Sequence, residues 1–73
     1  MIQRVNGIEV ELTRIRDGFE VRSQGVFLGT VHRKERVGEI LWQANDSKRF
    51  RTIMTGAVED LLVRAELIDG IGW

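Results

Sequence analysis

The segment Phe19–Ala44, which reads FEVRSQGVFLGTVHRKERVGEILWQA, constrains the fold more than any other part of the chain. Apolar and polar residues alternate along it in short runs, as they do in strands with one buried face. A turn signal, Gln24-Gly25, and a polar loop, Lys34–Gly38, separate the runs. We therefore predict short antiparallel strands joined by tight connections.

The residues before this segment continue the same pattern. Asn6-Gly7 is a strong hairpin signal, because both residues tolerate the positive φ angles of a type I′ turn. Ile8, Val10 and Leu12 then alternate with polar residues, and Asp17-Gly18 provides the next turn. Strands are therefore expected through the first 51 residues.

A helix is predicted over residues 52–68. Thr52 is placed to cap it, and apolar residues recur every four positions from Ile53 to Ala65, the stripe of a helix that lies on a sheet. Gly56 costs about 1 kcal/mol relative to alanine in such a helix, so it is expected to mark a close approach to a strand. Asp69-Gly70 provides the stop.

The expected fold is α+β: an antiparallel sheet of four to six short strands packed against one C-terminal helix. Residues 1–73 form one domain, with strand hairpins over 1–51, a short strand at Arg49–Arg51 and a tail over 69–73. Large aromatic side chains must supply much of so small a core. These are Trp42, Phe19, Phe27 and Phe50.

Composition limits the classes of protein that the chain can represent. It has 73 residues, 42% hydrophobic and 30% charged, which is ordinary for a folded domain. It contains no cysteine, so disulfides and thiolate metal sites are excluded. No apolar run approaches the roughly 18 residues of a membrane span, and the N-terminus lacks a signal-peptide core. We expect a cytoplasmic protein with no membrane partner.

Residues that could carry catalysis are few. The single histidine, His32, lies in an expected strand beside two cations, with no nucleophile motif near it. No phosphate-binding loop is present, and Gly70-Ile71-Gly72 is followed by no helix. We expect neither an enzyme nor a cofactor or bound metal.

Charge is balanced overall but divided along the chain. Eleven basic and eleven acidic residues cancel, yet the strand half is basic and the helix half acidic. In a simple meander, the Asp17-Gly18 turn and the Lys34–Gly38 loop lie at the same end of the sheet. Five cations would then gather at that end: Arg14, Arg16, Arg33, Lys34 and Arg36. A clustered charge of this kind can steer a partner onto one face.

Some apolar residues have no place in the expected core. If Phe27 and Trp42 face the helix, Leu28 and Leu41 face away from it, toward solvent or a partner. Trp73, at the end of the tail, could fold back onto the domain or dock into another chain.

From Phe19 to Leu67 the chain resembles AP2 domains and the arm-binding N-terminal domains of phage integrases. In these, short strands end in an aromatic residue and a threonine before a helix, as Phe50 and Thr52 do here. The resemblance implies a sheet that enters a DNA groove with basic side chains on its exposed face. The layout LGTV…W-A…FRT…A…LL is also similar in style to small proteins of phages and actinobacteria.

Two functions remain open. The first is a DNA-binding accessory or regulatory module that contacts duplex DNA. Its phosphate contacts would be Arg22, Arg33, Lys34, Arg36, Arg49 and Arg51, with His32 or Gln43 near bases. The second is a protein-binding inhibitor or adaptor, such as one encoded by a phage, that binds a host or phage protein. It would use Leu28, Leu41, the acidic helix face or Trp73. The basic strands favour the first function, and the near-zero net charge favours the second.

Overall fold

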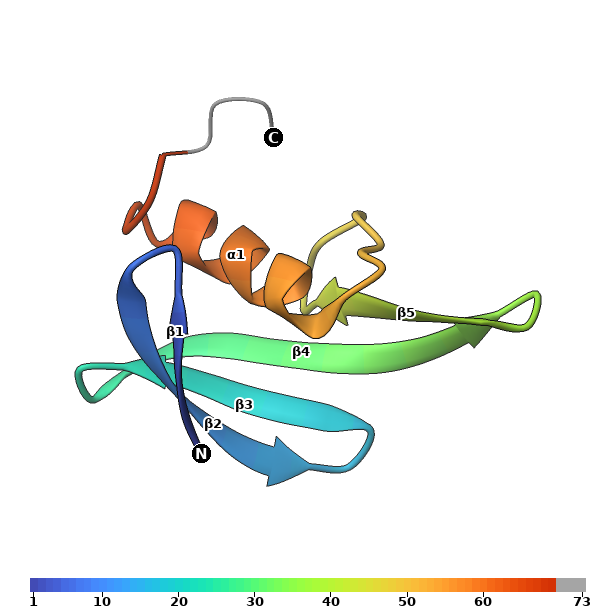
Figure 1. Cartoon of the computed structure of the whole chain (residues 1–73), viewed down its shortest axis with the longest axis horizontal. Helices are drawn as coiled ribbons and strands as arrows, with labels where there is room; N and C mark the ends of the chain where they lie inside the picture. Colours follow the sequence, from blue (N-terminus) through green and yellow to red (C-terminus); the bar gives the residue numbers. More distant parts are fainter. Residues whose placement is uncertain (70–73) are drawn as a thin grey trace.

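The computed structural model describes residues 1–69, which form one antiparallel sheet and one helix (Figure 1). The predicted α+β class is confirmed. The sheet is an up-and-down meander with its five strands in chain order. The elements are β1 (Ile2–Val5), β2 (Ile8–Ile15), β3 (Gly18–Ser23), β4 (Val26–Arg36), β5 (Glu39–Ala44) and α1 (Met54–Arg64).

The helix covers one side of the sheet, and most of the core lies between them. α1 packs across β4 and β5 and also touches β1. Strand valines and leucines meet helix residues in this layer. The fully buried large side chains are Val10, Leu12, Val21, Val31, Val58, Leu61 and Leu62. We call this the helix side of the sheet and the opposite face the open side.

The hairpin connections are tight turns. Asn6-Gly7 has positive φ angles at both residues, as predicted for its type I′ turn, and the predicted turn at Gln24-Gly25 has them too. The expected loop at Lys34–Gly38 is wrong, because β4 continues to Arg36 and the chain reverses at Val37 and Gly38. Val37 has a φ of 49°, a conformation that β-branched residues rarely adopt.

A bulge reverses the facing of two residues in β4. Arg22 pairs with Phe27, whereas Val21 pairs with Gly29, so Leu28 is an extra residue in the ladder. Leu28 consequently packs against the core, and the Phe27 side chain lies on the open side, 51% exposed. The prediction that Phe27 faces the helix and Leu28 faces away is wrong for this reason.

Trp42 and Phe50 are less buried than predicted. Trp42 packs against the edge of the core and stacks on Phe19, with ring centroids 6.4 Å apart, but it is only partly buried. Phe50 is exposed, and Arg49–Arg51 forms no strand. A single bridge joins Arg51 to Trp42. Aliphatic residues therefore supply most of the core.

The helix is shorter than predicted at both ends. Its N-cap residue is Ile53, which provides no side-chain hydrogen bond, so the assignment of Thr52 as the cap is wrong. At the C-terminus, the Leu67 N–H donates to the Leu62 carbonyl, a Schellman closure with Glu66 at a φ of 61°. The chain thus leaves the helix before Asp69. Among the described residues, no helix has the length and apolar character needed to cross a membrane.

Arg51 fastens the segment before the helix to the helix itself. Its guanidinium donates to Asp60 at 2.7 Å, and the Asp60 side chain is almost completely buried. A Cβ added at Gly56 would lie 3.0 Å from the Arg51 Cβ. Gly56 therefore marks the expected close approach, in this case to the segment that bridges to β5.

Candidate functional site

The meander brings two connections to one end of the sheet, as predicted from turn parity (Figure 1). These are the turn between β2 and β3 and the turn between β4 and β5. The Arg33 N–H donates to the Asp17 carbonyl at 2.7 Å, which ties β4 directly to the β2–β3 turn. We call this the cationic end, and its basic residues are Arg14, Arg16, Arg33, Lys34 and Arg36.

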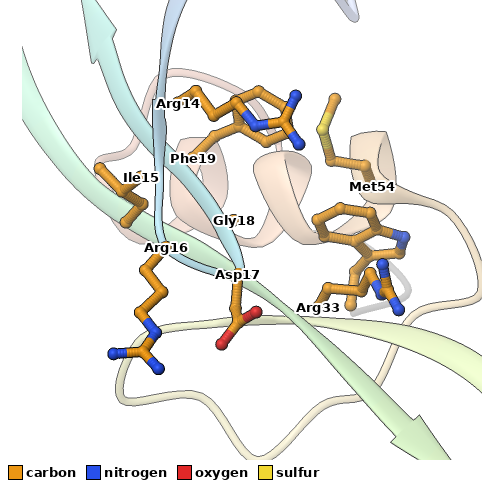
Figure 2. A pocket seen from close by; sticks show the side chains of 9 residues that line it. Arg14, Ile15, Arg16, Asp17, Gly18, Phe19, Arg33 and Met54 are labelled. Atoms are coloured by element: carbon orange, nitrogen blue, oxygen red, sulfur yellow. The ribbon is translucent and has the colours of Figure 1, made fainter.

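The cationic end contains a cleft of about 540 Å³ (Figure 2). We call it the arginine cleft. It lies beside the first turn of α1, since Met54 is both the first helix residue and part of its lining. The lining residues are Arg14, Ile15, Arg16, Asp17, Gly18, Phe19, Arg33, Trp42 and Met54.

Strand register sets the order of side chains in the cleft. Arg14 is the cross-strand partner of Phe19, and Arg33 is that of Trp42. Cross-strand partners point to the same face of a sheet, so each arginine shares the helix side with the aromatic residue opposite it. In Figure 2 the Arg14 and Phe19 side chains extend to the helix side, whereas that of Asp17 extends away.

Gly18 allows the β2–β3 turn to approach β4. A Cβ at this position would lie 1.9 Å from the Val31 carbonyl oxygen, which no side chain could tolerate without backbone movement. The close approach helps to place the turn residues Arg16 and Asp17 at the rim of the cleft.

The cations of the cleft have no counter-ions among the described residues. Ion pairs within residues 1–69 include Arg22–Glu20, at 3.0 Å, and Arg51–Asp60, at 2.7 Å, and neither involves an arginine of the cleft. Asp17 lines the cleft but forms no ion pair with its arginines. Uncompensated guanidinium groups in a concave site concentrate a positive field that attracts anions.

The open side carries a second group of polar residues on β4 and β5. His32 pairs with Gln43, and Lys34 pairs with Leu41, so all four lie on this face. The Arg36 guanidinium lies 4.7 Å from the centroid of the Phe50 ring. We call this group, His32, Lys34, Arg36, Leu41, Gln43 and Phe50, the open-side strip.

Carboxylates occupy the rest of the open side. Glu9 and Glu11 on β2 and Glu20 on β3 share this face with Arg4 and Arg22. Arg22 is already paired with Glu20, and its guanidinium lies over Phe27 at 5.4 Å. A polyanion on this face would therefore meet Glu9, Glu11 and Glu20 on β2 and β3, and Glu39 opposite Arg36 at the end of the open-side strip.

The predicted nucleic-acid contacts do not lie on one surface. Five of them, Arg22, His32, Lys34, Arg36 and Gln43, share the open side, whereas Arg33 points to the helix side and lines the arginine cleft. Arg51 is held by Asp60. Arg49 lies in a hollow beside α1 with Val63 and Arg64.

The sequence predicted correctly that Arg14 and Arg16 lie at the cationic end of the sheet, but they were not among the predicted nucleic-acid contacts. Sequence reasoning also assigned Phe50 to the core, although Phe50 lies exposed under Arg36. Pairing Arg14 with Phe19 across the β2–β3 turn could have revealed one wall of the cleft.

The residues predicted for a protein partner are likewise separated. Leu28 belongs to the core, and Leu41 is partly buried on the open side. Trp73 lies outside the described residues.

Between Met1 and Asp69, no three His, Asp or Glu side chains gather closely enough to hold a metal ion. The His32 Nε2 atom lies 2.9 Å from the Thr30 hydroxyl.

Comparison with known proteins gives no relative: no family model, curated protein or solved structure matches the chain. A function must therefore be inferred from the residues of the chain itself.

Proposed function

We propose that this chain is a non-enzymatic, cytoplasmic DNA-binding module that acts as a small accessory or regulatory protein. One observation carries the proposal: cations from β2, β4 and their turns meet at one end of the sheet, and none of them has an ion-pair partner among the described residues. These are Arg14, Arg16, Arg33, Lys34 and Arg36, of which Arg36 lies over the Phe50 ring. Phosphates are the ligands that such a group favours most.

The open-side strip gives this module a way to approach bases. Lys34 and Arg36 would contact phosphates, while His32 and Gln43, side by side on β4 and β5, would reach base edges in a groove. The glutamates on β2 and β3 would keep the duplex on the β4–β5 half of the sheet. Arg51 is left out of the contact set because Asp60 holds it.

The salt dependence of affinity for a labelled duplex tests this proposal. About four phosphate contacts predict that log affinity falls against log salt with a slope of about −3.6. Replacing Arg14 and Arg33 together by Gln should flatten the slope by about 1.8, because two contacts are lost.

A charge-matched control is available in Arg4→Gln/Lys48→Gln, which removes two exposed cations outside the cationic end. It should keep the steep slope. Unchanged anisotropy at tens of micromolar wild-type protein in low salt would end the DNA proposal.

A second candidate function, a protein-binding inhibitor or adaptor, is favoured by an apolar groove at the other end of the sheet. The groove measures about 260 Å³ and includes Val26 and Leu67, which are 60% and 44% exposed. Capture of a host or phage protein that survives nuclease treatment and is lost in Leu67→Glu would support this function.

A further inference from the structure

We infer that the arginine cleft binds one unpaired nucleotide, with its base against the Phe19–Trp42 wall and its phosphates at Arg14 and Arg33. DNA with a single-stranded end would then bind more tightly than blunt duplex. The inference rests on the proposed function, because it takes nucleic acid as the ligand, and it adds which form of nucleic acid the cleft selects.

The aromatic wall provides the first argument. Phe19 on β3 and Trp42 on β5 meet across β4, with their rings inclined by 29°. Both side chains are only partly buried, and both line the cleft. Tryptophan is large and rarely fully buried, and here the two rings pack against the core on one side and line the cleft on the other. Aromatic surface in such a position can stack on a base of any sequence.

The two arginines provide the second argument. Each is the cross-strand partner of one of the aromatic residues, Arg14 of Phe19 and Arg33 of Trp42. A guanidinium binds a phosphate with two parallel hydrogen bonds. Neither has a carboxylate partner within the described chain, and the Asp17 side chain extends away from Arg14 (Figure 2). Stacking surface and phosphate donors therefore alternate within one site.

The size of the cleft argues for a single nucleotide. Its volume, about 540 Å³, falls within the roughly 300–1,000 Å³ of sites that enclose small ligands. A base within a duplex has both faces covered by its neighbours and cannot stack on a protein ring. Only an unpaired or extruded base can enter.

Three labelled hairpin DNAs of equal stem sequence, each closed by a non-nucleotide linker so that no loop base is unpaired, test the inference. One has a blunt end, one has a four-nucleotide overhang, and one has the same overhang with abasic sugars in place of its nucleotides. The abasic overhang keeps the phosphates and removes the stacking surface. Stacking of one base predicts that the natural overhang binds about 5- to 160-fold more tightly than the abasic one.

The outcomes separate the two proposals. Equal affinity for natural and abasic overhangs, with a steep salt dependence, would overturn the nucleotide site and keep DNA binding. No binding of any hairpin would overturn both.

Tryptophan fluorescence gives a readout that does not depend on altering the cleft. In Trp73→Phe protein, Trp42 is the remaining tryptophan. The natural overhang should change its emission, and the abasic overhang should change it far less. Identical responses to the two would contradict the inference.

A pair of phenylalanine variants tests whether the tighter binding of the natural overhang arises in the arginine cleft. Phe19→Leu retains apolar packing but removes the ring, so the ratio of the two overhang affinities should fall toward one. The matched control, Phe27→Leu, removes an exposed ring on the open side. In Phe27→Leu the ratio of the affinities for the natural and the abasic overhang should stay as in the wild type. If that ratio falls to one in both variants, the base does not stack in the arginine cleft. Should Phe19→Leu fail to fold, the hairpins and the Trp42 signal decide.

Discussion

Val37 has the most unfavourable backbone conformation among the described valines. It lies at the tip of the β4–β5 hairpin with a φ of 49°, and its side chain is fully exposed. A left-handed conformation costs an ordinary residue roughly 1–2 kcal/mol, whereas Asn adopts it readily. Val37→Asn should therefore raise the free energy of unfolding by about 1 kcal/mol, measured by chemical denaturation. Val26→Asn, at an exposed strand position, should give no gain, and an equal gain at both sites would refute the strain argument.

This residue also shows where sequence reasoning reaches its limit. The Asn6-Gly7 and Gln24-Gly25 turns were predictable, because glycine and its neighbour mark positive φ angles. Val37 is a residue type that rarely adopts a positive φ angle, so it does not mark the turn. The polar segment Lys34–Gly38 was therefore predicted to be a loop. Leu28 shows a similar limit: strict alternation predicts its facing, but a bulge inserts one residue and reverses it.

At the scale of single elements, α1 forms because its apolar stripe has a sheet to cover, not because its N-terminus is well capped. The apolar stripe was predictable from its periodicity; of the positions predicted from Ile53 to Ala65, the central Ala57, Val58, Leu61 and Leu62 are buried, whereas Ile53 and Ala65 are exposed. The boundaries were not predictable, because Thr52 lies one residue before the cap and Glu66 ends the helix with a left-handed conformation. The C-terminal end is set by the local Schellman closure through Leu67 and Leu62.

The helix start can be improved by substitution. Ile53 occupies the N-cap position, is 60% exposed and accepts no hydrogen bond through its side chain. Ile53→Ser should stabilise the fold by about 1 kcal/mol, since a serine hydroxyl satisfies a free N–H in the first turn. Thr52→Ala should change stability by less than about 0.5 kcal/mol, as for other exposed positions. Thermal unfolding measures the stability change of both variants. A loss of stability larger than this in Thr52→Ala would show that Thr52 is the cap.

For the molecule as a whole, charge placement matters more than net charge. The sum is zero, yet the meander gathers unpaired cations at one end. That gathering was predictable, because turn parity alone determines which connections share an end. The cleft was not, since it depends on strand register, on where the helix begins and on the stacking of Phe19 and Trp42.

Gathering cations for a ligand should reduce stability when the ligand is absent. Arg14 and Arg33 line one cleft and repel each other, and this repulsion is screened as the Debye length falls from about 30 Å at 0.01 M salt to about 3 Å at 1 M. Arg14→Gln/Arg33→Gln should therefore raise the melting temperature at 0.01 M salt, with a gain of about 0.2–1 kcal/mol that disappears at 1 M.

The control Arg4→Gln/Lys48→Gln separates this effect from the general influence of salt on folding. It removes the same number of charges from outside the cationic end, so its melting temperature should follow the wild type at both salt concentrations. Melting curves recorded by circular dichroism for the three proteins provide the comparison. If the two double variants respond to salt in the same way, the cleft stores no electrostatic strain, and its arginines are compensated by interactions elsewhere in the molecule.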